Sequence, residues 1–339
     1  MGRMTFPDAV ESALAQAMAE DERIIVFGED VPRLRRNLFV RFGGGRVLET
    51  PISEGAFVGA AVAAAMAGLR PVVEVMMVDF IAVAVDALLN HAAKVKAFSG
   101  GCWDVPVVVR AACGAGYGDG GQHGQSLWGW LAHIPGLTVV VPSTPADAGG
   151  LMLAAIEHEG PVVYLEHKLL CDDWLDFLGG ARRKNVTFDV PRDGARGPVP
   201  KYWEPVPLGQ AVSRHEGSDL TIVSLGVGAH RALEAARLLK RQGVSAGVVD
   251  LRTVSPLDRE TVCEAVSKTG RMLVVDEDYE GFGLSGELAA VVLEAGIAAR
   301  YGRVCTQDTI PYVRDLEDEA LPNVGRIVTA AMRLMEAEA

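Results

Sequence analysis

The stretch VGAAVAAAMAGLRPVVEVMMV, residues 58–78, decides the fold class. Its first half is rich in alanine and predicts a tightly packed helix that ends at Gly68, because glycine commonly terminates helices. Its second half, residues 70–78, is a nearly continuous apolar run, which is typical of a strand buried on both faces. A helix followed directly by such a strand indicates an α/β protein with a mostly parallel sheet.

The same alternation continues in both directions along the chain. We expect further strands at residues 23–28, 105–110, 137–141, 161–166, 220–225, 246–250 and 271–275, and further helices at 82–98, 147–157 and 229–242. Residues 179–207 break this rhythm with a Gly-Gly pair, mixed charges and five prolines. They are predicted to be a linker between two domains, residues 1–178 and 208–339.

The composition limits the class of protein. The chain has 339 residues, enough for two domains with separate cores, and 49% of them are hydrophobic. The formal net charge of −12 disfavours nucleic acid and anionic membranes as partners, although acidity also simply keeps many proteins soluble. Five cysteines without a CxxC pair are typical of reduced thiols. No apolar run approaches the roughly 20 residues that span a bilayer, and residues 1–20 lack the apolar core of a signal peptide, so we expect a cytoplasmic protein.

Two stretches carry residues suited to catalysis. TPISEG, residues 50–55, places Glu54 directly before the alanine-rich helix, where a carboxylate also complements the helix dipole. CGAGYGDGGQHGQS, residues 113–126, has six glycines that allow a ligand to approach the backbone, and it contains His123. Such a loop is often only flexible, and a single histidine is often structural. The residues by themselves leave both interpretations open for Glu54 and His123.

A series of motifs in one order resembles the E1 β subunits of the 2-oxo-acid dehydrogenases, which are transketolase-like thiamine diphosphate enzymes of the pyruvate, acetoin and branched-chain types. The motifs are GEDV at 28–31, TPISEG at 50–55, AGLRP at 67–71, VDF at 78–80, QHGQS at 122–126, AHIPGL at 132–137, VPSTP at 141–145, LEHKLL at 165–170, VDLRT at 249–253 and PLD at 256–258. They cover nearly the whole chain apart from the expected linker. So many matches in order make the resemblance specific.

The resemblance implies a transketolase-like α/β fold, in which a pyrimidine-binding domain is followed by a C-terminal transketolase domain, each with a mostly parallel sheet. It also implies that Glu54 contacts N1′ of the aminopyrimidine of thiamine diphosphate. A carboxyl group there can shuttle a proton, provided that its surroundings keep the protonated and ionised forms close in energy. The helix dipole favours the ionised form, so burial would have to oppose it.

Three further site residues are implied by the resemblance. Ile52 and Phe80 are expected to bind the aminopyrimidine, the Phe80 ring by offset stacking, although an aromatic at a strand end is also a common core residue. His123 is expected to face the substrate side of the thiazolium. An imidazole can donate or accept a proton near neutral pH, so it suits both orientation of the substrate and acyl transfer to a lipoyl group.

The resemblance also implies partners. Gly118-Asp119-Gly120 looks like the start of the GDG…N motif that binds Mg²⁺ and diphosphate, but no asparagine lies between Asn90 and Asn185. An α subunit is therefore expected to hold the Mg²⁺ and the diphosphate of the cofactor, in an α2β2 heterotetramer. The implied reaction is decarboxylation of a small 2-oxo acid, or cleavage of acetoin, with transfer of the acyl group to a lipoyl-bearing E2 acyltransferase.

Some residues depart from the family pattern. Gly124 stands where the family commonly has serine, and Leu127-Trp128 stands where Pro-Glu or Leu-Glu is usual. Asp276-Glu277-Asp278 replaces a more typical His-Glu-Ala. A tryptophan beside the active-site loop could narrow the substrate pocket, so the sequence leaves the substrate open.

Two alternative functions remain. GFGLSG, residues 281–286, is a GxGxxG motif that follows the strand expected at 271–275, with Asp308 downstream, which is typical of an NAD(P)-binding oxidoreductase. Five residues separate that strand from the first glycine, however, whereas a dinucleotide-binding turn is tight. The second alternative is a non-catalytic paralogue. The presence of Glu54, Phe80 and His123 argues against it.

Overall fold

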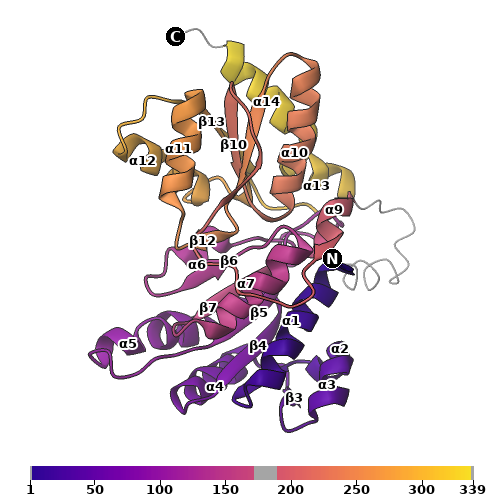
Figure 1. The fold of residues 1–339 in the computed structure, drawn as a ribbon, viewed down its shortest axis with the longest axis vertical. Helices are drawn as coiled ribbons and strands as arrows, with labels where there is room; N and C mark the ends of the chain where they lie inside the picture. Colours follow the sequence, from indigo (N-terminus) through magenta and orange to yellow (C-terminus); the bar gives the residue numbers. More distant parts are fainter. Residues whose placement is uncertain (1, 172–188, 337–339) are drawn as a thin grey trace.

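The computed structural model describes residues 2–171 and 189–336, which form two α/β units (Figure 1). The first unit is built on a seven-stranded sheet. Its strands are β2 (Ile24–Gly28), β3 (Val47–Glu49), β4 (Arg70–Met77), β5 (Val108–Cys113), β6 (Thr138–Val140), β7 (Val162–His167) and β12 (Thr253–Ser255). They lie in the order β12-β6-β7-β5-β4-β2-β3, and every neighbouring pair is parallel except β12 with β6. The expected mostly parallel sheet is confirmed for this unit.

Helices cover both faces of this sheet. They are α1 (Phe6–Glu20), α2 (Val31–Leu34), α3 (Arg36–Phe42), α4 (Glu54–Met66), the 3₁₀ helix η1 (Val78–Ala84), the π-helix η2 (Ala87–Ala92), α5 (Val95–Phe98), α6 (Trp128–Ala132), α7 (Pro145–Glu157) and the 3₁₀ helix η3 (Lys168–Leu170). Helices α1 and α7 pack together on one face, and α4, η1 and η2 cover the other. Successive residues of a strand point to opposite faces, so Val72 packs toward α1 and Val73 toward α4.

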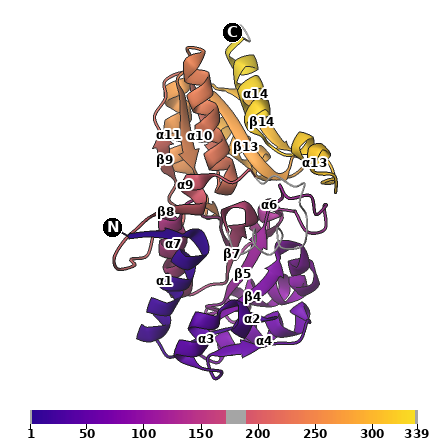
Figure 2. The same cartoon turned by 90° about the vertical axis from the view of Figure 1, so that its right-hand side faces the viewer.

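The second unit has a five-stranded sheet in the order β14-β13-β10-β11-β9, parallel except where β9 joins β11. Its elements are β9 (Val212–His215), β10 (Leu220–Ser224), α10 (Gly226–Arg241), β11 (Ala246–Asp250), α11 (Arg259–Thr269), β13 (Arg271–Tyr279), α12 (Leu284–Glu294), β14 (Arg300–Thr306), α13 (Arg314–Ala320) and α14 (Val324–Glu336). Helices α10 and α14 lie side by side on one face (Figure 2). Helices α11 and α12 cover the other face (Figure 1).

One apolar core joins the two units. It contains Val109 and Val163 from the first sheet together with Val223 and Val249 from the second. Strand β12 adds to the connection, because it follows β11 in the chain but hydrogen-bonds to β6 of the first sheet. Among the described residues, no helix combines the length and the apolar content required to cross a membrane.

The segment expected as a linker is attached to the first unit where it is described. The expected boundary at residue 178 lies outside the described residues. Farther on, α9 (Arg192–Ala195) leads into β8 (Arg196–Val199), which pairs antiparallel with β1 (Gly2–Thr5). Trp203 is buried, and its indole N–H donates to Ser12 Oγ on α1 at 3.1 Å. This part of the segment is therefore packed against α1 and α7.

The single helix predicted at residues 82–98 is wrong. The chain instead forms η1, η2 and α5 in succession, which are 3₁₀, π and α in turn. The β-branched residues Ile81, Val83 and Val85 weaken a regular α-helix, because their χ1 freedom is restricted against the preceding turn. The predicted helix at 58–68 is present but begins four residues earlier, at Glu54.

A buried ionic network lies on the α1 side of the first sheet. Arg110 on β5 is 3% exposed and donates to Glu74 Oε1 at 2.9 Å and to Glu166 Oε2 at 3.0 Å. Arg35 binds the same Glu74 carboxylate at 2.9 Å. Burial raises the pKa of Glu74, but Arg110 and Arg35 outweigh this effect and lower it to about 2. The Glu74 carboxylate is therefore ionised and depends on its arginine partners.

Replacing Arg110 by methionine would leave two carboxylates buried without their shared cation. We expect Arg110→Met to lower the free energy of unfolding by roughly 3–5 kcal/mol, which is typical of breaking a buried ion pair from one side. The measurement is urea unfolding followed by circular dichroism. Arg23→Met is the matched control, since Arg23 pairs with Asp21 at the surface. Equal losses in the two variants would contradict the role of the network.

Candidate active site

The predicted site residues follow three strands of the first sheet at the same edge. Glu54 opens α4 after β3, Phe80 lies in η1 after β4, and His123 lies in the loop after β5. The carboxyl ends of parallel strands share one edge, which is the usual ligand-binding edge of such sheets. Helix α4 also meets η1 closely, because a Cβ on Gly55 would lie 3.2 Å from the carbonyl oxygen of Val83.

Phe80 and His123 are in direct contact. Their ring centroids are 5.9 Å apart and the ring planes cross at 88°, an edge-to-face arrangement. Ile52 lies just before α4 with 73% of its surface exposed, and it adds apolar surface at the same edge. The structure thus brings His123 and Phe80 together and leaves Ile52 free to meet a ligand or a partner.

Glu54 is partly buried in the first turn of α4, and the side chain of Ser53 does not cap this helix. A second carboxylate, Glu29, follows β2 at the same edge. Burial raises the pKa of Glu29, and the nearby carboxylates of Asp30, Glu54 and Glu49 raise it further. Sequence reasoning did not select Glu29, although it lies in the GEDV motif at the end of a predicted strand.

Gln125 connects the segments that carry Phe80 and His123. Its backbone N–H and its side-chain Nε2 donate to Asp79 Oδ1 at 3.3 and 2.8 Å. Its Oε1 accepts from the hydroxyl of Tyr279 at 3.1 Å. Asp79 immediately precedes Phe80, so this amide fixes the two aromatic side chains relative to each other and to the second unit.

A buried lysine, Lys168, hydrogen-bonds to the loop that carries His123. The Lys168 ammonium donates to Tyr117 Oη at 2.5 Å, to the Gly114 carbonyl at 3.4 Å and to the His123 carbonyl. Burial lowers the pKa of Lys168 to about 8, although nearby carboxylates such as Asp79 act in the opposite direction. The sequence offered LEHKLL only as a family motif and gave no sign of this role.

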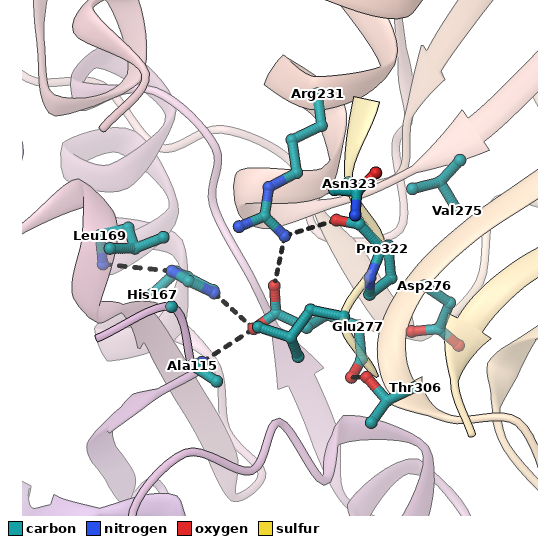
Figure 3. Close-up of polar contacts among 12 residues, drawn as sticks. Ala115, His167, Leu169, Arg231, Val275, Asp276, Glu277, Thr306, Pro322 and Asn323 are labelled. Atoms are coloured by element: carbon teal, nitrogen blue, oxygen red, sulfur yellow. Dashed lines mark hydrogen bonds and ion pairs between the residues drawn. The ribbon is translucent and has the colours of Figure 1, made fainter. Parts of the chain in front are cut away.

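A carboxylate from the second unit reaches into the first (Figure 3). Glu277 Oε1 lies 2.8 Å from His167 Nε2 and accepts from the backbone N–H of Ala115 at 2.9 Å. Its Oε2 accepts from Arg231 at 3.0 Å. Burial raises the pKa of Glu277, but His167 and Arg231 outweigh it and lower the pKa to about 2.

The site contains buried polar atoms without hydrogen-bond partners among the described residues. They are Thr50 Oγ1, Asp79 Oδ2, His123 Nδ1 and Ser126 Oγ. All four belong to the segments that meet at the carboxyl edge of the sheet. Buried polar atoms without such partners are unfavourable, so these four atoms are suited to contact with a polar ligand. Together with Phe80 and Ile52 they suit a heteroaromatic ring that carries hydrogen-bonding atoms.

Trp128 does not line an open pocket. Its side chain is buried in the joint core, and its indole N–H donates to Asp276 Oδ1 at 2.8 Å. Burial and the neighbouring Asp278 raise the pKa of Asp276 to about 7. Asp278 Oδ2 accepts from the backbone N–H of Gly129 at 2.8 Å. The two departures from the family pattern, at 127–128 and 276–278, are therefore in contact with each other.

The glycine motif at residues 281–286 has a structural explanation. It joins β13 to α12, and a Cβ on Gly283 would lie 2.2 Å from the carbonyl oxygen of Tyr279. A Cβ on Gly281 would meet nothing within 4 Å. The close approach at Gly283 is thus to the chain itself, as a tight strand-to-helix connection requires.

Comparison with known proteins identifies the class. The transketolase pyrimidine-binding domain matches residues 3–172, and the transketolase C-terminal domain matches residues 209–327. A split-gene transketolase, solved as an inactive β4 tetramer, superposes with a TM-score of 0.76 at 23% identity, over 98% of this chain and 99% of its own. The protein therefore has the two-domain transketolase-type fold, as predicted.

Curated relatives define the family more closely. The β subunit of acetoin:2,6-dichlorophenolindophenol oxidoreductase from Cupriavidus necator is 37% identical over 97% of this chain and 96% of its own length. The β subunit of 2-oxoisovalerate dehydrogenase from Bacillus subtilis is 37% identical over 99% of this chain and its full length. The β subunit of the pyruvate dehydrogenase E1 component from Rhizobium meliloti is 38% identical over 97% of this chain and 69% of its own length.

The chain belongs to the family of E1 β subunits of the 2-oxo-acid and acetoin dehydrogenases. The predicted resemblance is confirmed. The family is in general dependent on thiamine diphosphate, and its members are components of oxidoreductases.

The glycine motif can be tested by substitution. Gly283→Ala should lower the melting temperature, because its methyl group would displace the Tyr279 carbonyl, whereas Gly281→Ala should leave the temperature nearly unchanged. Neither variant should alter any affinity for NADH. Differential scanning calorimetry and NADH fluorescence titration measure the two effects. Saturable NADH binding by the native chain that Gly283→Ala abolishes would support a dinucleotide site.

Proposed function

We propose that this chain is the β subunit of a thiamine-diphosphate-dependent E1 dehydrogenase that is active only with an α subunit. The observation that supports the proposal is that Glu54, Phe80 and His123 follow strands that end at one sheet edge, with Phe80 and His123 in contact, in a chain about as long as the β subunits it resembles. Its substrate would be a small 2-oxo acid or acetoin. The names of its relatives support both choices.

The residues at this edge fit the aminopyrimidine of the cofactor. Phe80 would stack against the ring and Ile52 would add apolar contact, while the unpaired polar atoms nearby could accept or donate hydrogen bonds. When bound, thiamine diphosphate supplies a carbon nucleophile that adds to a carbonyl group and then accepts the electron pair released on bond cleavage. The chain itself supplies binding, orientation and proton transfer.

Glu54 would hold and move the proton at N1′ of the aminopyrimidine. It lies partly buried in the first turn of α4, at the sheet edge where the aminopyrimidine would bind. His123 would orient the substrate and exchange a proton with it. Its edge-to-face contact with Phe80 supports this role, because the imidazole would then lie beside the bound ring.

A second chain would complete the site. The only GDG sequence, Gly118-Asp119-Gly120, lies in the glycine-rich loop of the first unit and has no downstream asparagine at the family spacing. An α subunit would therefore bind Mg²⁺ and the diphosphate in an α2β2 heterotetramer, and a lipoyl-bearing E2 acyltransferase would receive the acyl group. The formal net charge of −12 disfavours nucleic acid and anionic membranes as partners, and the proposed location is the cytoplasm.

The proposal is tested by adding the missing subunit. The α chain is sought in a neighbouring reading frame that encodes GDG…N. The purified β chain should bind thiamine diphosphate and Mg²⁺ poorly in titration calorimetry and should not reduce 2,6-dichlorophenolindophenol. The α and β chains together should reduce the dye with pyruvate, 2-oxobutyrate, a branched 2-oxo acid or acetoin, and without NAD⁺.

Each outcome separates one alternative. Tight cofactor binding by the β chain alone would show that its site is complete. Dye reduction that strictly requires NAD⁺ would favour the alternative of an NAD(P)-binding oxidoreductase. An assembled complex that binds cofactor but reduces no dye with any of these substrates would favour a non-catalytic paralogue.

Glu54→Gln tests the proton shuttle. The amide keeps the size of the side chain and a hydrogen bond but cannot exchange the proton at N1′. We expect an intact complex with turnover about 10²-fold lower or more, the usual scale for loss of a general acid–base group. Exchange of the cofactor C2 hydrogen for deuterium, followed by NMR after acid quench, should slow in parallel. The control is Glu49→Gln, which removes a neighbouring carboxylate. Unchanged exchange in Glu54→Gln would remove this residue from the mechanism.

A further inference from the structure

The loop that carries His123 is rich in glycine. Gly114, Gly116, Gly118 and Gly120 alternate along it, and all four have φ between 71° and 109°. Glycine readily adopts such positive φ values and so allows this backbone conformation, but these four residues contribute no side chains that could hold the loop. The catalytic geometry of His123 therefore depends on contacts from other elements.

The second unit supplies such a contact through Glu317 on α13. Glu317 is 1% exposed, and its Oε1 accepts from the backbone N–H of Gly116 at 3.0 Å. Its Oε2 accepts from the backbone N–H of Gly118 at 2.9 Å. Arg314 lies 3.6 Å from the same carboxylate. Charge-assisted bonds of this kind are stronger than neutral ones, and here both oxygens are used.

Gly116 and Gly118 flank Tyr117 in the sequence, and Tyr117 contacts His123. The Tyr117 side chain is 1% exposed, and its hydroxyl donates to the carbonyl oxygen of His123. Fixing the amides on both sides of Tyr117 fixes the direction of its side chain. The position of His123 is thus linked to a carboxylate in the other unit through two backbone bonds and one phenol.

We propose that Glu317 is a positioning residue for His123, acting through Gly116, Tyr117 and Gly118. Its two carboxylate oxygens are taken up by the loop backbone, so it would act through the loop and make α13 part of the active-site support. The inference rests on the proposed function, since it assigns a task to a residue that acts through His123. Glu54 approaches from a different segment, β3 and α4, so its proton transfer does not depend on Glu317.

The first test measures the loop directly, without cofactor. Hydrogen–deuterium exchange by mass spectrometry on the full chain should show faster exchange in peptides that contain Gly116 and Gly118. We expect about tenfold for Glu317→Ala and a smaller increase for Glu317→Gln, which keeps one acceptor oxygen. Peptides from β5 should be unchanged. Glu319→Gln, an exposed acid on the same helix, is the matched control and should match the native chain.

The second test uses the assembled α and β chains. Displacing a catalytic group by about 1 Å can lower turnover about 10²-fold. Glu317→Ala should lower kcat for dye reduction tenfold or more, and Glu317→Gln should give an intermediate value. Exchange of the cofactor C2 hydrogen, which uses Glu54, should stay at the native rate in both. Loss of turnover with intact C2 exchange distinguishes positioning of His123 from general destabilisation.

The failures of the inference and of the proposed function are distinguishable. A native complex without dye reduction would reject the proposed function, while the exchange measurement on the loop would still decide whether Glu317 holds it. Native activity with unchanged loop exchange and turnover in the Glu317 variants would overturn the inference. If Glu317→Ala does not fold, Glu317→Gln decides by the same two readouts.

Discussion

The carboxylate of Glu277 is the interaction on which the arrangement of the two units depends. It is buried between them and is held by an imidazole and a backbone amide from the first unit and by a guanidinium from the second. A buried charge is tolerated only when such partners are present together, because each one that is missing leaves the desolvation of the others uncompensated. Glu277 therefore fixes the position of the second unit relative to the first. Apolar packing alone would allow the two units to slide against each other, whereas the partners of this carboxylate are satisfied in only one arrangement.

The active-site edge is stiffened in the same way. Gln125 joins the segment of Phe80 to that of His123, and Tyr279 joins both to the second unit. Lys168 lies under the loop with acceptors from the loop backbone. Buried polar networks that are fully satisfied are rigid, since hydrogen bonds in a low-dielectric interior are strong and directional. Four buried polar atoms at this edge, Thr50 Oγ1, Asp79 Oδ2, His123 Nδ1 and Ser126 Oγ, have no hydrogen-bond partner among the described residues and are available to a ligand.

Much of the fold could be predicted because it rests on local pattern. Residues 246–250 were expected as a strand and form β11 with the same bounds, and the alanine-rich run before Gly68 forms α4. Glu54, Phe80 and His123 could be selected because the motifs that contain them resemble those of a known family, whereas the residues by themselves left the roles of Glu54 and His123 open. The helix expected at 82–98 failed since its β-branched residues and its packing against α4 divide it into three kinds of helix. Glu317 was out of reach, because its partner Gly116 lies 201 residues away and no local pattern encodes that distance.

Because of strand β12, the boundary between the two units in the sequence differs from their boundary in the folded structure. It belongs to the second half of the chain, yet it covers the outer edge of β6. An uncovered strand edge presents free N–H and C=O groups, and it is a template for pairing with other chains and for aggregation. A fragment that ends before residue 253 would expose this edge, so the first unit should be expressed with the strand that completes it, by circular permutation or as the whole chain. The sequence divides into two units, but the first unit needs a strand from the second half of the chain to cover its sheet edge.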